Sequence, residues 1–109
     1  MNARALLLAE RARTRERLAA LRGDHAAMVD ASRDSNADDE HDPEGATIAF
    51  ERSQVDAVIG QAERQLAEVE KALVRLVDGS YGTCEACGRP IPAARLEARP
   101  TARTCVGCA

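Results

Sequence analysis

The chain has 109 residues, a formal net charge of −3 and a hydrophobic fraction of 45%, with one Phe, one Tyr and no Trp. This length fits one domain, or one small domain with an extension. The scarcity of aromatic side chains excludes a thick mixed core and favours long helices with a narrow apolar seam. No stretch approaches the roughly eighteen apolar residues of a membrane span, and the apolar run after Met1 is too short for a signal peptide. We therefore expect a cytoplasmic protein.

The charge is unevenly distributed. Residues 1–29 carry six arginines against three acidic residues, whereas residues 30–44 carry seven acidic residues against Arg33 alone. The chain has no overall basic face for duplex binding, so we do not expect direct sequence-specific DNA recognition.

Two helices are predicted in residues 1–78. In the first, over about residues 2–30, one stripe contains Leu7, Thr14, Leu18, Leu21 and Met28, with Arg11 and His25 at the remaining seam positions. His25 is interpreted as a seam residue and not as a ligand, since no Cys or other His lies near it at helical spacing. The second helix, over about residues 46–77, has a nearly continuous heptad stripe of Ile48, Val55, Ile59, Ala62, Leu66, Val69, Leu73 and Leu76.

The two helices are similar in length and are joined by a polar segment, about residues 31–45. The simplest arrangement is an antiparallel coiled-coil hairpin, so the predicted fold is mainly α. Gly79 is the expected left-handed cap of the second helix. Because each stripe finds an apolar partner within the same chain, we expect a monomer.

The acidic segment between the helices allows more than one interpretation. A run of charges is usually a solvated loop. Asp42, Pro43 and Glu44 also suit a helix start, with Pro43 at the first helical position. Carboxylates at the end of a stiff helical pair would, in addition, suit a device that reaches into a narrow site. The residues alone leave these interpretations balanced.

Residues 79–109 contain every cysteine of the chain, in two C-x2-C pairs: Cys84, Cys87, Cys105 and Cys108. This spacing is typical of a tetrahedral four-cysteine zinc site, and Gly88 offers the backbone freedom that such a knuckle needs. Disulfides are the alternative, but they require an oxidising compartment. Four thiolates close the coordination sphere, so we expect one structural zinc ion. Ile91 and Leu96 are the expected interior of this small unit, which needs the metal to fold.

The segment around the cysteines resembles the DksA/TraR family of bacterial zinc-finger transcription regulators. The resemblance is dense over about residues 79–108, because residues between the ligands agree as well, including Gly82, Ile91, Pro100 and the run Arg95-Leu-Glu-Ala-Arg99. Over residues 1–78 the resemblance is one of architecture. It implies a protein that binds RNA polymerase, with its coiled coil in the secondary channel and acidic tip residues near the catalytic magnesium.

The family's tip motif, Asp-x-x-Asp-x-Ala, falls on His41, Glu44 and Ala46, with Asp42 beside the first position. The resemblance therefore assigns partner binding at the tip to Asp42, Glu44 and Ala46. Positions that are basic in members that bind ppGpp fall on Gln61, Glu68 and Ala109, so the resemblance does not extend to control by ppGpp.

Other classes of protein fit the residues less well. An enzyme is not expected, because the sequence shows no nucleophile–base pair. A nucleic-acid-binding zinc ribbon is the main alternative, since Arg89, Arg95, Arg99 and Arg103 would give a small positive patch. The other alternative is a structural or oligomerising coiled coil.

Overall fold

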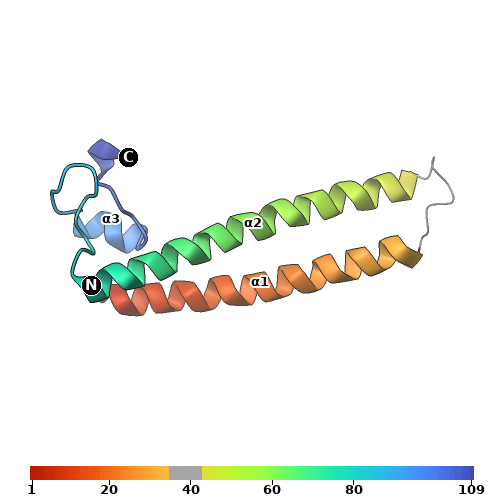
Figure 1. The fold of residues 1–109 in the computed structure, drawn as a ribbon, viewed down its shortest axis with the longest axis horizontal. Helices are drawn as coiled ribbons and strands as arrows, with labels where there is room; N and C mark the ends of the chain where they lie inside the picture. Colours follow the sequence, from red (N-terminus) through yellow and green to blue (C-terminus); the bar gives the residue numbers. More distant parts are fainter. Residues whose placement is uncertain (35–42) are drawn as a thin grey trace. The chain divides into compact units, whose positions relative to one another are not determined.

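The computed structural model describes the backbone of residues 1–34 and 43–109 and the side chains of residues 1–31 and 46–109. Two long helices, α1 (Ala3–Asp34) and α2 (Pro43–Asp78), are followed by the short helix α3 (Ala93–Ala98) and a 3-10 turn η1 (Val106–Cys108) (Figure 1). The chain forms two compact units, one made of residues 1–14 with 65–109 and the other of residues 15–64. The predicted mainly helical hairpin with a cysteine-bearing C-terminal part is confirmed.

In the unit of residues 15–64, α1 and α2 pack along the predicted seam. Leu18 and Ala62 are buried, with exposed fractions of 2% and 3%. The Nε2 atom of His25 lies 2.7 Å from Oδ1 of Asp56 and joins the two helices. His25 is thus a half-buried seam residue, as the sequence predicts.

In the other unit the seam is more completely closed. Leu7, Val69 and Ala72 have no exposed surface and form one apolar cluster. Arg11 of α1 lies 3.7 Å from Glu70 of α2. Thr14 is buried at a seam position. Its hydroxyl donates a hydrogen bond of 2.8 Å to the carbonyl oxygen of Glu10, so the buried hydroxyl has a partner.

The helices extend further into the acidic segment than the sequence predicts. α1 continues to Asp34 and α2 already begins at Pro43, so the segment between them is shorter than the expected 31–45. Proline at the first helical position fits the helix start, because its missing N–H has no intrahelical acceptor there. At its other end α2 finishes at Asp78. Gly79 follows with a φ of 85°, so it is the expected left-handed cap.

The compact unit of residues 1–14 and 65–109 contains parts of both long helices together with the C-terminal segment. Tyr81 packs against the apolar cluster of α1 and α2 and also against the interior of the C-terminal segment. Arg103 lies 3.5 Å from Glu68 of α2 and adds an ion pair between the same two regions. No helix in the described ranges 1–34 and 43–109 combines the length and the apolar content that crossing a membrane requires.

Candidate metal centre

The four cysteines converge at one point of the C-terminal segment. The sulfur atoms of Cys84, Cys87, Cys105 and Cys108 all lie within 4.8 Å of one another. The sulfurs of Cys87 and Cys105 are 3.8 Å apart, and all four cysteines are free of disulfides. A tetrahedron with Zn–S bonds of about 2.3 Å has edges of about 3.8 Å, so the spacing fits a zinc ion and excludes an S–S bond between this pair.

The backbone of the first knuckle is shaped by a tight turn. The N–H of Gly88 donates to the carbonyl oxygen of Cys84 (2.9 Å), and the N–H of Cys84 donates to that of Arg89 (2.8 Å). Gly88 has a φ of 73°, a conformation that a side chain would strain. The knuckle is closed by an antiparallel bridge between Thr83 and Pro90.

The second knuckle is held against the first by the main chain. The N–H of Glu85, inside the first pair, donates to the carbonyl oxygen of Arg103 at 2.9 Å, two residues before the second pair. The N–H of Cys108 donates to the carbonyl oxygen of Cys105 at 3.1 Å within the turn η1. These bonds bring sulfurs that are far apart in sequence to one centre.

The acidities of the thiols differ within the cluster. Backbone hydrogen bonds, first from Cys105 and then from Cys87, lower the pKa of Cys84 to about 6. Hydrogen bonds with the neighbouring sulfurs, first Cys105 and then Cys87, raise the pKa of Cys108 to about 12. Four sulfurs at this distance repel as thiolates, and a divalent cation removes that cost. The donor set therefore suits a soft divalent metal.

A small apolar cluster supports the metal centre. Cys84, Ile91, Leu96 and Ala102 are buried together, with Tyr81 and Cys105 packed against them. The expected interior positions of Ile91 and Leu96 are confirmed. Tyr81 was not predicted to take part, and its hydroxyl donates a 2.8 Å hydrogen bond to the carbonyl oxygen of Pro100. Tyr81 is the single Tyr of the chain and lies between the α2 cap and the first cysteine. This position is the sequence signal from which its role could have been predicted.

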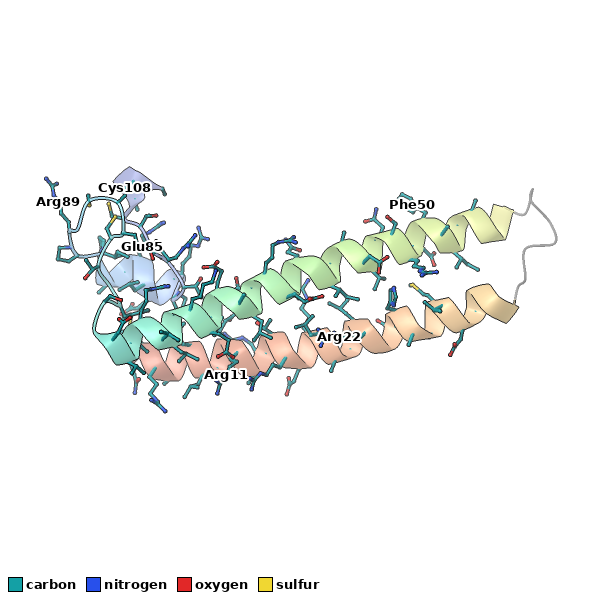
Figure 2. The ribbon with its side chains drawn as sticks, in the orientation of Figure 1. Arg11, Arg22, Phe50, Glu85, Arg89 and Cys108 are labelled. Carbon is teal, nitrogen blue, oxygen red and sulfur yellow. The ribbon has the colours of Figure 1, made fainter. Side chains whose placement is uncertain are left out.

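Three of the four arginines of this segment line one cavity, and Arg89 does not line it. Arg95 donates from Nε to the carbonyl oxygen of Thr104 at 2.8 Å, and Arg103 pairs with Glu68. Together with Arg99 they line a cavity of about 380 Å³ that Glu68 and Glu85 also line. Arg89 is exposed and projects from the loop of the first knuckle (Figure 2). The positive charge is thus partly neutralised within the molecule.

The predicted tip residues fall largely outside the described part of the chain. His41 and Asp42 lie among residues 35–42, and the side chain of Glu44 is also outside the described residues. Ala46 is described and is exposed on the first turns of α2. In the same part of α2, Phe50 is 65% exposed and projects on the side away from α1 (Figure 2).

Comparison with known proteins gives a family for the C-terminal segment and relatives that extend beyond it. Residues 79–109 match the model of the prokaryotic dksA/traR C4-type zinc finger. General stress protein 16O of Bacillus subtilis is 41% identical over 73 residues, which are 66% of this chain and 44% of that protein. The RNA polymerase-binding transcription factor DksA of Caulobacter vibrioides is 60% identical over 37 residues, 34% of this chain and 26% of that protein. The chain thus spans less than half the length of these two relatives.

The fold is shared with a solved structure. Transcription factor DksA2 from Pseudomonas aeruginosa superposes with a TM-score of 0.82 at 26% identity, over 97% of this chain and 76% of that chain. The C4-type finger and the four converging sulfurs indicate one structural zinc ion. Residues 79–109 are therefore a C4-type zinc finger of the prokaryotic dksA/traR kind, and the chain shares its helical fold with DksA2.

Proposed function

We propose that this protein is a zinc-stabilised regulator of bacterial transcription that acts by binding RNA polymerase. The observation that carries the proposal is the likeness to DksA2, which covers 97% of this chain and includes both the hairpin and the finger. Relatives named as RNA polymerase-binding transcription factors support the same partner. Those names describe binding factors and no catalytic reaction, which agrees with a protein that is not an enzyme.

The zinc ion serves folding and not chemistry in this proposal. Cys84, Cys87, Cys105 and Cys108 are its ligands, and with four thiolates no position remains open for water or substrate. The finger packs on the hairpin through Tyr81, so the metal also holds the end of α2 in place.

The hairpin enters the secondary channel of the polymerase and presents its tip to the active site. Two antiparallel helices put their connection at one end of the pair, and this connection contains the acidic segment. Asp42 and Glu44 lie toward the catalytic magnesium, and Ala46 leaves room for close approach. A carboxylate near a catalytic Mg²⁺ changes the local electrostatic potential and so the stability of the open complex, without forming or breaking bonds.

The test separates binding from effect. The double variant Asp42→Asn/Glu44→Gln should bind core RNA polymerase with nearly wild-type affinity, because the helices make most contacts, and should lose its effect on initiation in vitro. The matched control is Asp38→Asn/Glu40→Gln, which removes the same charge from the same segment. Equal loss of effect in both double variants would mean that bulk charge, and not these positions, is responsible. Absence of micromolar binding by the wild-type protein would refute polymerase binding itself.

The protein acts as a monomer in this proposal. The most deeply buried seam residues, Leu7, Leu18 and Val69, are already covered within one chain. Sedimentation should give the mass of a single chain. A dimer would instead favour the oligomerising coiled coil.

A further inference from the structure

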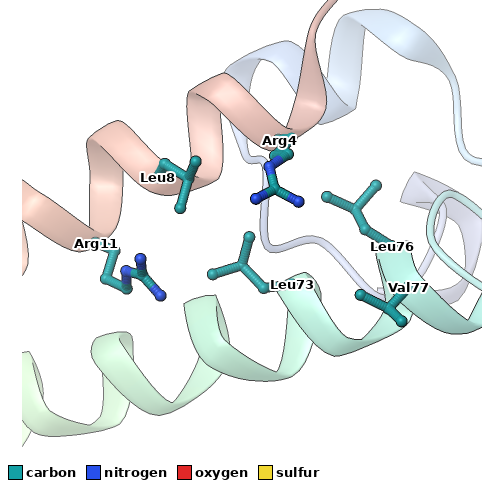
Figure 3. Close-up of a pocket in the computed structure, with 6 residues that line it drawn as sticks. All are labelled: Arg4, Leu8, Arg11, Leu73, Leu76 and Val77. Carbon is teal, nitrogen blue, oxygen red and sulfur yellow. The ribbon is translucent and has the colours of Figure 1, made fainter.

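A groove lies between α1 and α2 in the unit that contains the start of α1 and the end of α2. It has a volume of about 470 Å³ and is lined by Arg4, Leu8, Arg11, Leu73, Leu76 and Val77 (Figure 3). None of these residues belongs to the metal centre or to the acidic segment. The zinc finger and the tip therefore leave this surface without an assigned role.

The floor of the groove is apolar and accessible. Val77 is 85% exposed, although it is a large aliphatic side chain. Leu8, Leu73 and Leu76 are half-buried, so they complete an apolar surface that still contacts solvent. Such a surface, bordered by polar residues, is typical of a protein contact.

The rim of the groove is positively charged. Arg4 and Arg11 lie on α1 on either side of Leu8, and in Figure 3 both side chains reach from α1 toward α2. Their separation of seven residues corresponds to two helical turns, about 10 Å. The distance between Nη1 of Arg11 and Oε2 of Glu70 is 3.7 Å, which is long for an ion pair. The guanidinium of Arg11 has several N–H donors, so it is able to bind a second carboxylate.

The start of α1 adds to this charge. The first turn of α1 contains Arg4 and no acidic residue. The helix macrodipole places partial positive charge at that end, where Asn2 Oδ1 accepts the N–H of Ala5 and Glu97 lines the surface beside Met1 and Asn2, and Arg4 adds a full positive charge. A carboxylate from outside the chain would pair with Arg4 at the rim of the groove.

We propose that this groove binds an amphipathic helix of the protein partner, with apolar side chains on the floor and two carboxylates about two turns apart on Arg4 and Arg11. The charge complementarity selects an acidic helix over a basic or purely apolar one. The inference rests on the proposed function in one respect, namely that the helix belongs to RNA polymerase.

The experiment measures the affinity of the full-length zinc-loaded protein for core RNA polymerase. The groove variant is Arg4→Glu/Val77→Asp, which reverses one rim charge and places a carboxylate on the exposed floor. The matched control is Arg17→Glu/Ala67→Asp, which reverses one arginine charge and adds one carboxylate at exposed helix positions that do not line the groove. Circular dichroism and zinc content check that both variants fold. The groove variant should bind at least tenfold more weakly, and the control should stay within twofold of wild type.

A photo-crosslinking side chain at position 77 then identifies the occupant. Attachment to a polymerase peptide that carries apolar and acidic residues supports the proposal. Attachment to a second copy of this chain, or to a peptide without acidic residues, overturns it. If the wild type binds polymerase and the groove variant binds equally well, the groove inference fails while the proposed function stands. If the wild type does not bind, both fail.

Discussion

The helical hairpin and the zinc finger are stabilised in different ways. In the hairpin, buried residues such as Leu7, Leu18 and Val69 recur along two long helices, so the stabilising contacts are many and individually small. In the finger, few buried apolar residues surround one four-cysteine centre. We therefore expect the finger to unfold as a whole when its metal is lost. In the hairpin, each seam substitution should lower the free energy of unfolding by a limited amount.

The largest effect is expected from Cys105→Ser. Removing one of four thiolates abolishes tight zinc binding, and structural zinc supplies on the order of 10 kcal/mol of folding free energy in small fingers. The zinc content measured by elemental analysis should fall from one equivalent per chain to well below one. The NMR signals of the folded finger should be lost as well. The control Thr83→Ser, at an exposed neighbouring position, should keep the metal. Retention of one tightly bound zinc by Cys105→Ser would contradict the four-cysteine assignment.

A smaller effect is expected from Leu7→Ala in the hairpin. Leu7 has no exposed surface, so the substitution should lower the free energy of unfolding by about 2–5 kcal/mol through lost burial and a cavity. Val77→Ala, at a position that is 85% exposed on α2, should change it by less than about 0.5 kcal/mol. Urea denaturation with zinc bound gives both values. Similar losses in the two variants would show that the seam is not the source of hairpin stability.

The smallest effect is expected from Tyr81→Phe, at the contact between the two regions. Losing the hydroxyl bond to Pro100 should cost about 1 kcal/mol. Burial raises the pKa of Tyr81 above 10.0, so its contribution is fully present below pH 10 and is lost as the pH rises through the raised pKa. The difference between wild type and Tyr81→Phe should therefore shrink in strongly alkaline solution. A difference that does not change with pH would argue against this burial.

Much of this architecture could be predicted from residues close together in the sequence. The heptad stripe, the cap at Gly79 and the paired cysteines are local or periodic signals, and each corresponds to a feature of the structure. The helix ends in the acidic segment were placed less well, because charged residues suit the exposed turns of a helix as readily as a loop.

The helical hairpin and the zinc centre thus follow from the sequence alone, since a repeat of apolar residues and a ligand spacing each imply their own geometry. The packing of the finger on the hairpin could not be predicted in this way, because the contacts of Tyr81 with both clusters and of Arg103 with Glu68 join residues that no local pattern pairs. Tertiary contacts also give Arg95 and Arg103 of the finger separate partners and bring Arg4, Leu8 and Val77 to one groove. Such features depend on which side chains meet across elements, and this is fixed by packing and not by periodicity.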